Sequence, residues 1–417
     1  MPKHSVDLLI LNSDQTITVP SKIEGSDVLG IIDNGGVAVD NGRVVQAAAS
    51  EFLDRKYSAR KKIVASNQII LPGFVDPHTH LVFAGSREDE FESRVAGKGY
   101  MQSLRGGGGI IETVRRTRYA MPDELYSTGY KRLTQALLNG TTTIEVKTGY
   151  GLDMSGEEKM LRVINRLRKF HRSNVIGTFL GAHAIPPEHP TTDDYTRFLL
   201  RDLLPMAQKI GGAVFCDVFC EAGVFAADQS GRILRSALKL GFKPKIHADE
   251  FTDSGGARVA NQVGAVSADH LIHSPMSELG KMNDTGVVPV LLPGSSHSLL
   301  MKEHAPAREM LSMGLPVALG TDFSPANWML NQLTVAALAA RELQMKSDEI
   351  IRGITTNAAR ALGLERTVGS IAPGQRADLV LLNVPNHKWI GYAYDDGLVN
   401  KVLIRGEVVV EEGRPVF

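Results

Sequence analysis

The sequence predicts an α/β fold: a (β/α)8 TIM barrel with a small β-sandwich-like domain built from both ends of the chain. Two observations carry this prediction. In the middle of the chain, eight apolar strand-like runs alternate with amphipathic helical stretches, which is the pattern of a parallel sheet built from βα units. Both ends instead consist of short strands separated by turn signals. We therefore expect residues 1–70 and 367–417 to form one composite β domain, and residues 71–366 to form the barrel.

The strands of the predicted β domain are short, and two turns mark how they connect. Near the amino terminus, three apolar runs with a hairpin turn at Asp40-Asn41-Gly42 lie at residues 7–11, 36–39 and 43–45. Near the carboxyl terminus, three similar runs with a turn at Arg405-Gly406 lie at residues 377–382, 400–404 and 407–410. The like character of the two ends is the reason to join them in one domain.

Each predicted barrel strand is followed by a polar segment. The strands are expected at residues 69–75, 141–146, 175–180, 214–219, 243–246, 265–267, 287–292 and 316–319. The segments after them carry, in order, His78 and His80, Lys147 and Tyr150, His183, Glu221, His247 and Glu250, His270, Gly294, and Asp322. Enzymes with a (β/α)8 barrel build their active site from the loops at the carboxyl ends of the strands. The fold and a catalytic site therefore support each other.

Two histidines end the first predicted strand, in Asp76-Pro77-His78-Thr79-His80. Side chains alternate along a strand, so His78 and His80 project to the same face and offer two imidazoles to one cation. His247 and Asp322 follow the fifth and eighth strands, and strands one and eight are neighbours in a closed barrel. The four residues predict a mononuclear metal site, which a hydrolase uses to activate water at neutral pH.

Longer motifs resemble those of the imidazolonepropionases, a family of the amidohydrolase superfamily, over nearly the whole chain. The matching segments are residues 71–80, 140–152, 178–187, 217–221, 246–251 and 267–271. The first of them and Thr321-Asp322 identify only the superfamily, whereas the others taken together are much more specific. The resemblance implies hydrolysis of the ring carbon–nitrogen bond of 4-imidazolone-5-propanoate to N-formimidoyl-L-glutamate, a step of histidine degradation.

The resemblance also implies one divalent metal, zinc or iron, and a homodimer. Imidazole and carboxylate ligands suit both metals, so the choice between them stays open. Glu250 lies three residues beyond His247, close enough to handle a proton or to hold a ring nitrogen. His270 can hydrogen-bond the water or the developing oxyanion. Asp322 can also accept the proton of the water, so the identity of the general base is open.

Recognition of the substrate carboxylate is expected from Arg87, because a guanidinium fork binds a carboxylate through two parallel hydrogen bonds. Tyr100 and Tyr150 can assist. By resemblance, Arg87, Tyr150, His183 and Glu250 contact the substrate. The glycine run at residues 106–109 precedes a predicted helix start, and its amides offer an alternative anion site. A flexible loop is the preferred interpretation of that run.

The loop after the eighth strand departs from the family pattern. The family has an Asn-Pro-Gly segment followed by a hydroxyl residue, whereas this chain has Ser324-Pro325-Ala326-Asn327 after Asp322-Phe323. Residues of this loop hold the substrate or the opened product in the family. Ser324, Ala326 and Asn327 are therefore expected at the substrate, with Ser324 in place of an amide and Asn327 in place of a hydroxyl.

Composition narrows the class of protein further. The chain has 417 residues, 43% of them hydrophobic, and 46 basic against 46 acidic residues. Such a balance argues against charge-driven binding to nucleic acid or to a membrane surface. No apolar run approaches the roughly 18 residues of a membrane span, and no signal peptide is evident. We expect a cytoplasmic protein with a small carboxylate-bearing substrate, and its two cysteines, Cys216 and Cys220, as small buried residues.

Three alternatives accompany this interpretation. A heterocycle deaminase of the same superfamily would use the same metal, but it would not need the carboxylate clamp of Arg87. A catalytically silent barrel would not keep the four metal ligands together with Glu250 and His270. Lys147 offers a carboxylated lysine bridging two metals, but the binuclear relatives place that lysine after strand four, where this chain has Phe219-Cys220-Glu221. One metal is therefore preferred.

Overall fold

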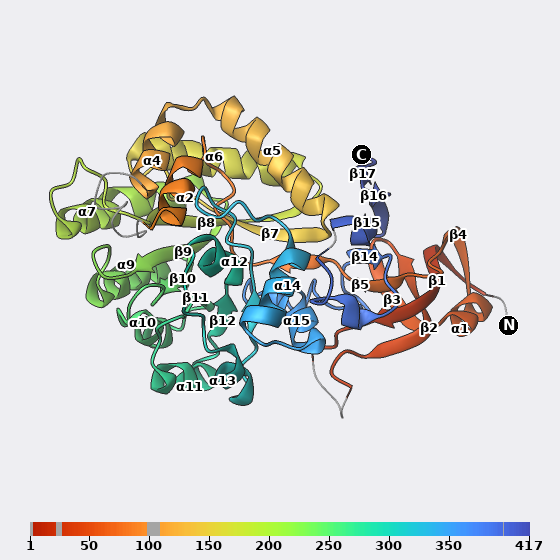
Figure 1. Ribbon diagram of the computed structural model, residues 1–417. Coiled ribbons are helices and arrows are strands. Elements are labelled where there is room, and N and C mark those ends of the chain that lie inside the picture. The colour runs from red at the N-terminus through yellow and green to blue at the C-terminus, as the bar shows by residue number, and fades with distance from the viewer. Residues whose placement is uncertain (1–2, 22–26, 98–108, 395) are drawn as a thin grey trace. The chain divides into compact units, whose positions relative to one another are not determined.

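A computed structural model gives the fold of the chain and describes residues 3–21, 27–97, 109–394 and 396–417 (Figure 1). Eight of the described strands form one sheet in chain order from β6 to β13, with parallel pairing recorded from β8 to β13. They are β6 (Phe74–Asp76), β7 (Thr141–Lys147), β8 (Asn174–Ala182), β9 (Ala213–Cys220), β10 (Lys243–Ala248), β11 (Ser267–His270), β12 (Val288–Leu291) and β13 (Ala318–Leu319). The predicted barrel is confirmed.

Helices cover the outside of these strands, and Figure 1 shows α9, α10 and α11 following one another there. The amphipathic α6 illustrates why they form: Asp153 caps its first turn by accepting from Gly156 N at 2.6 Å, and Met160, Ile164 and Leu167 are buried on one side. The helices of this part are α2 (Glu88–Val95), α4 (Ile110–Tyr119), α5 (Pro122–Leu138), α6 (Met154–Phe170), α7 (Thr192–Phe198), α8 (Leu204–Ile210), α9 (Ala227–Lys239), α10 (Gly256–Val263), α11 (Met276–Thr285), α12 (Pro293–Ser298) and α13 (Ala307–Ser312). Helices α14 (Gln332–Glu342), α15 (Ser347–Gly353) and α16 (Thr356–Arg360) follow β13.

The chain segments just beyond β6 and β13 meet and close the circle of strands. The backbone N–H of His80 donates to the Phe323 carbonyl at 2.8 Å, and that of Asp322 donates to the His78 carbonyl at 3.0 Å. Thr79 and Phe323 form a parallel bridge between these hydrogen bonds. Closure therefore brings Asp322 next to the two histidines that follow the first barrel strand.

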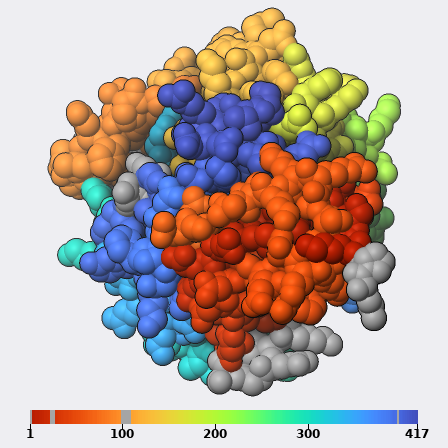
Figure 2. Space-filling model, turned by 90° about the vertical axis from the view of Figure 1, so that its right-hand side faces the viewer, coloured from red at the N-terminus to blue at the C-terminus, as the bar shows by residue number. Residues whose placement is uncertain are grey.

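The second sheet contains strands from both ends of the chain, as predicted. Its order is β17-β16-β15-β14-β5-β1-β2-β3, with β4 paired to β1. Its strands are β1 (His4–Ile17), β2 (Ile31–Asp40), β3 (Arg43–Ala49), β4 (Tyr57–Val64), β5 (Ile69–Pro72), β14 (Leu379–Leu382), β15 (Val399–Ile404), β16 (Glu407–Glu411) and β17 (Arg414–Pro415). Figure 2 shows the amino-terminal and carboxyl-terminal segments side by side on one face.

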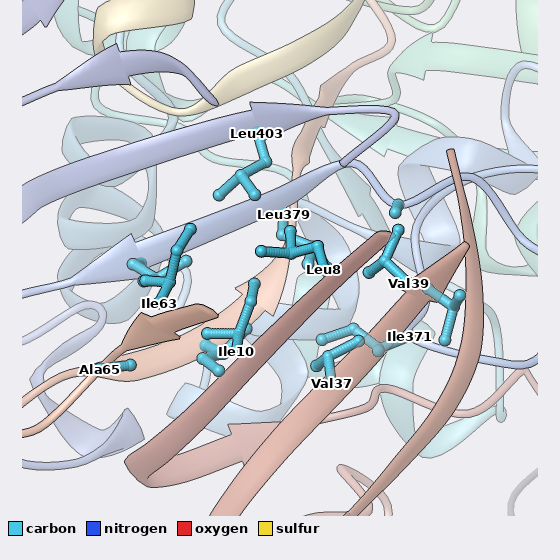
Figure 3. Close-up of a cluster of buried hydrophobic side chains, with 13 residues drawn as sticks. Leu8, Ile10, Val37, Val39, Ile63, Ala65, Ile371, Leu379 and Leu403 are labelled. Carbon is cyan, nitrogen blue, oxygen red and sulfur yellow. The ribbon is translucent and has the colours of Figure 1, made fainter. Parts of the chain in front are cut away.

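This second sheet folds back on itself around its own core. Leu8 and Ile10 of β1 lie in one buried cluster with Leu379 of β14 and Leu403 of β15 (Figure 3). Leu9 points to the opposite face, where it belongs to a second buried cluster with Leu53 of α1 (Ser50–Lys56). The alternation along β1 is that of a strand buried on both faces, which gives the sandwich-like character.

The chain forms two compact units. One consists of Met1–Asp76, Thr134–Thr143 and Asn331–Phe417, and the other of Pro77–Leu133 and Ile144–Leu330. Every described residue that the sequence analysis assigns to metal or substrate belongs to the second unit. The domain boundaries at 70/71 and 366/367 stay a prediction. None of the described helices is long and apolar enough to cross a membrane.

The run at 69–75, expected to be one barrel strand, is two strands that belong to different sheets. β5 pairs with β14, whereas β6 begins the barrel. Gly73 separates them, and a Cβ there would lie 2.2 Å from Oγ1 of Thr142, so only glycine permits this close approach. The sixth strand, expected at 265–267, is β11 (Ser267–His270), because polar Asp269 and His270 belong to the strand itself.

A buried histidine in the second unit gives the first testable prediction. His171 packs edge-on against Tyr130, and its Nδ1 accepts from Ser173 N at 3.1 Å. Burial lowers the pKa of His171 from 6.5 to about 4. The unfolded chain therefore binds a proton at this residue below about pH 6.5, whereas the folded chain binds it only near pH 4. Because the unfolded state binds more protons between these values, the free energy of unfolding falls as the pH drops through this window, by up to about 1.4 kcal/mol per pH unit from this group.

The variant His171→Asn removes this proton uptake but keeps an oxygen acceptor for Ser173 N. In urea unfolding, the stability advantage of the wild type over the variant should shrink as the pH falls from 6.5 toward 4. A constant difference across that range would contradict the assignment.

Candidate metal and active site

The four predicted metal ligands converge on one point. Nε2 of His78 lies 3.3 Å from Nε2 of His80, which in turn lies 3.3 Å from Nε2 of His247. Oδ1 of Asp322 lies 3.4 Å from Nε2 of both His78 and His80. Four ligands at about 2.0–2.1 Å around one tetrahedral ion lie about 3.3–3.4 Å apart. The four measured separations, three of which link His78, His80 and Asp322 while the fourth links His247 to His80, therefore fit the donors of a zinc-like cation.

Two buried carboxylates orient the histidines of this cluster. Oδ2 of Asp269 lies 2.6 Å from Nδ1 of His78, and Oδ2 of Asp217 lies 3.0 Å from Nδ1 of His247. The contact to His78 is a hydrogen bond, whereas Asp217 lies close to Nδ1 of His247 without hydrogen-bond alignment. A carboxylate beside Nδ1 favours the tautomer with the hydrogen on that nitrogen and leaves the Nε2 lone pair for a metal. The sequence analysis assigned no role to Asp217 or Asp269. An acid inside the otherwise apolar strand predicted at 214–219 is a signal that could have identified Asp217, whereas Asp269 lies beyond the strand predicted at 265–267.

A cavity lined by buried polar side chains lies against the cluster. Besides the ligands His80, His247 and Asp322, it is lined by the predicted Arg87, Tyr150, His183, Glu250, His270, Ser324 and Ala326. These side chains come from the carboxyl ends of six different strands and from the loops that follow them, so the closed barrel is what brings them together. The structure thus gathers in one place the groups that the sequence analysis assigned to metal, proton transfer and substrate.

His183 forms one wall of the cavity as a neutral ring. It stacks on His80 with ring centroids 4.8 Å apart, and its Nδ1 lies 3.0 Å from the Gly149 carbonyl. A carbonyl only accepts, so Nδ1 carries the hydrogen and Nε2 is left as an acceptor. Burial, together with the nearby His247, lowers the pKa of His183 to about 3.

The loop that carries Tyr150 is held by Glu157 of α6. Its Oε1 accepts from the backbone N–H groups of Gly149, Gly151 and Leu152 at 3.2, 2.9 and 3.0 Å. Tyr150 itself is buried, and its ring centroid lies 5.1 Å from that of His183. A single side chain of the helix therefore fixes the position of this wall.

Three other titratable groups of the cavity, Glu250, Asp322 and His270, have shifted pKa values. Burial, reinforced by Asp322 and Glu221, raises the pKa of Glu250 well above its usual range. Burial also raises the pKa of Asp322 to about 6, and it lowers the pKa of His270 well below its usual range. Oε1 of Glu250 lies 3.5 Å from Nδ1 of His270. The cavity therefore contains a carboxyl group that holds its proton to higher pH, beside a neutral imidazole.

Arg87 lines the cavity from the start of α2, where it is buried, and its Nη1 lies 3.6 Å from Oε2 of Glu90. Glu90 also accepts from Gly109 N at 2.6 Å, directly before α4, so the predicted helix start at Ile110 is confirmed. Tyr100 and residues 106–108 lie outside the described residues.

Three residues of the loop after β13 were predicted to contact the substrate, and two of them lie at the cavity. Ser324 and Ala326 line the cavity, but Asn327 does not. Nδ2 of Asn327 donates to the carbonyls of Thr321 and Asp322 at 2.8 and 3.1 Å, and its Oδ1 accepts from Ser298 Oγ at 2.9 Å. The amide of Asn327 thus fixes the loop that holds Asp322.

Neither cysteine lies at the cavity. Cys216 and Cys220 are buried in β9, and burial raises the pKa of Cys220 to about 11.

Lys147 is also buried, beside Asp217, Glu145 and Asp269. Burial alone would lower the pKa of Lys147, but these carboxylates raise it, so the side chain is a charged ammonium.

Residues 69–409 match the sequence profile of the Amidohydrolase family. The chain belongs to the amidohydrolase family. This amidohydrolase is 42% identical over 418 residues to the imidazolonepropionase of Symbiobacterium thermophilum, and the match covers 98% of each chain. It is 43% identical over 392 residues to the imidazolonepropionase of Geobacillus kaustophilus, with 93% of this chain and 92% of that one covered. The resemblance expected from the sequence motifs is confirmed.

Solved structures support the fold of this amidohydrolase. A zinc-bound adenosine deaminase from Xanthomonas campestris matches with a TM-score of 0.76 at 19% identity, over 100% of this chain and 95% of that one. Guanine deaminase of E. coli matches with a TM-score of 0.73 at 18% identity, over 97% and 99%. At such identities the likeness extends to the barrel and the second sheet, not to the substrate.

Proposed function

We propose that the chain is a metal-dependent imidazolonepropionase, which hydrolyses the ring carbon–nitrogen bond of 4-imidazolone-5-propanoate to N-formimidoyl-L-glutamate in histidine degradation. One observation carries the proposal: a buried arginine lines the same cavity as three of the four metal ligands, in a chain similar to imidazolonepropionases over 98% of its length. The arginine suits the propanoate, and the cluster suits hydrolysis of the ring beside it.

His78, His80, His247 and Asp322 would hold one zinc or iron ion. When bound, such an ion lowers the pKa of a water molecule to about 7 and polarises a carbonyl oxygen. The remaining requirement is proton transfer. A carbon–oxygen bond forms at the ring carbonyl carbon, the bond from that carbon to the ring nitrogen breaks, and the nitrogen takes a proton.

Side chains that line the cavity can accept and donate the protons that this reaction moves. Asp322 accepts the proton of the attacking water, and the protonated Glu250 donates to the departing ring nitrogen. Neutral His270 hydrogen-bonds the developing oxyanion. Nε2 of His183 accepts from a ring N–H, and Arg87 with Tyr150 binds the propanoate. Support for these roles comes from the positions of the groups around the cavity and from the shifts of their pKa values.

The test is direct. Purified metal-loaded protein should remove the ultraviolet absorbance of imidazolone propanoate, and the product should be N-formimidoyl-L-glutamate. Release of ammonia from a neutral heterocycle with no action on imidazolone propanoate would instead establish a deaminase.

A further prediction concerns Arg87. The change Arg87→Met should lower kcat/KM on imidazolone propanoate by roughly 10² or more, because a charge-assisted hydrogen bond contributes about 1.5–3 kcal/mol and two are lost. Lysine should not restore activity, since it lacks the planar fork. Wild type should also discriminate strongly against a substrate whose carboxylate is replaced by an amide, and the Met variant should hardly discriminate. Equal discrimination by both would move the carboxylate site elsewhere, first to the amides of residues 106–109.

The proposal extends to the setting of the enzyme. We expect a cytoplasmic homodimer that acts on a small molecule, without nucleic acid or membrane as partner. The balanced charge of the chain and its similarity to imidazolonepropionases support this expectation.

A further inference from the structure

Behind the metal ligands, five charged side chains form a fully buried network inside the barrel. Nζ of Lys147 lies 2.9 Å from Glu145 Oε2, 2.7 Å from Asp217 Oδ2 and 3.7 Å from Asp269 Oδ2. Nζ of Lys245 lies 3.0 Å from Glu145 Oε2 and 3.8 Å from Asp269 Oδ2. Three carboxylates and two ammonium groups thus occupy a volume that other barrels fill with branched apolar side chains.

Stability alone is a poor reason for such a network. Removing an ion from water costs several kcal/mol, and well-packed apolar side chains often replace a buried ion pair without loss. The placement of the charges suggests another reason. Two of the three carboxylates, those of Asp217 and Asp269, are the groups that lie against Nδ1 of His247 and His78.

Lys147 is the member of the network nearest to both orienting carboxylates. In both Asp217 and Asp269, one carboxylate oxygen, Oδ2, lies close to Nζ of Lys147 and also to Nδ1 of the histidine that the residue contacts. Without the ammonium, two like charges in a low-dielectric interior would repel each other. Any movement of Asp217 or Asp269 would turn an imidazole, because their contacts to Nδ1 fix the ring orientations.

We propose that Lys147 is a positioning residue for the metal site, acting through Asp217 on His247 and through Asp269 on His78. The inference rests on the metal site of the proposed function. It assigns to Lys147 the task of holding two carboxylates in place, so that Nε2 of His78 and Nε2 of His247 both stay directed at one cation.

The experiment measures zinc affinity, by titrating metal-free protein with zinc against a chromophoric chelator. The variant Lys147→Met should bind zinc about 10–100-fold more weakly than wild type, the loss typical of removing an outer partner of a ligand. The visible spectrum of the cobalt-substituted variant should change as well, since it reports ligand geometry. Unchanged affinity and an unchanged spectrum would overturn the inference, whereas a wild type that binds no zinc would overturn the proposed function instead.

A matched control and a second background separate positioning from general stability. Nζ of Lys159 on α6 donates to three carbonyl groups, of Thr117, Arg118 and Ala120, at 2.8–2.9 Å and away from the cavity. Lys159→Met should lower the melting temperature without changing zinc affinity.

In an Asp217→Asn background, one of the repelling charges is gone, so Lys147→Met should cost much less affinity than in wild type. Equal losses in the two backgrounds would contradict the coupling through Asp217.

The double variant Glu145→Gln/Lys147→Met keeps the tests decisive if Lys147→Met alone does not fold. It removes one charge of each sign and still deprives Asp217 and Asp269 of their shared ammonium. The same 10–100-fold loss of zinc affinity is expected on the scale of outer-partner effects, and wild-type affinity would overturn the inference.

Discussion

His247→Ala should strip the metal and abolish turnover while the protein stays folded. Of the four ligands, His247 is the one supplied by β10, and its backbone keeps its place because β10 pairs with both β9 and β11. Three donors bind a divalent ion more weakly than four, and the loss should exceed the roughly 10–100-fold typical of an outer partner. Elemental analysis should give about one divalent metal per wild-type chain and much less than one per variant chain.

His171→Asn is the control for this experiment, since it also removes a buried imidazole but one that is not among the metal-site clusters of the described residues. That variant should keep its metal and its turnover. Two results together would contradict the mononuclear assignment. Wild type would have to hold two equivalents of metal per chain, and the Lys147→Ala variant would have to stay less active than wild type even when saturated with zinc.

Glu250→Gln should keep the metal and lower kcat by roughly 10²–10⁴, the range expected when a positioned proton donor is lost. Glutamine matches the size of the side chain but cannot deliver a proton. Because the pKa of Glu250 is raised by burial, and further by Asp322 and Glu221, the acid form persists to unusually high pH. The kcat of wild type should therefore fall as the pH rises through this pKa, and the variant should lack that decline.

His270→Asn provides a comparison within the same cavity. It should also lower kcat while the metal stays bound, but the high-pH decline assigned to Glu250 should persist. Near-normal turnover in both variants would mean that Asp322 and the metal carry the proton chemistry alone.

The sequence predicts the fold well where a pattern lies within one segment, and poorly where the structure depends on which distant segment a strand pairs with. Alternation along a strand predicts that His78 and His80 share a face, and the structure has them 3.3 Å apart. The run 69–75 is apolar throughout, and nothing local reveals that β5 pairs with β14 while β6 joins another sheet. Only the close approach to Thr142 explains why Gly73 stands at the change.

The site shows the same division. Residues at strand ends can be predicted as a set, because a parallel barrel brings all such ends to one face. Asp217 and Asp269 lie within strands, and their importance depends on which side chain of a neighbouring strand they meet. Asn327 follows Asp322 closely in sequence, yet its amide is directed at backbone carbonyls rather than at the cavity. Contacts of this kind follow from three-dimensional packing, which local sequence patterns do not encode.

The order in which the ribosome makes the chain has a consequence for the first compact unit. Its segments end at Asp76, resume at Thr134–Thr143 and finish only with Asn331–Phe417. β5 therefore emerges early but meets its partner β14 after most of the chain has been made, a wait of some tens of seconds at about 5–20 residues per second. Throughout that time the apolar edge Ile69–Pro72 lacks the strand that later covers it. Slower elongation should lengthen this exposure, and chaperones that shield nascent strand edges should raise the soluble yield of the protein.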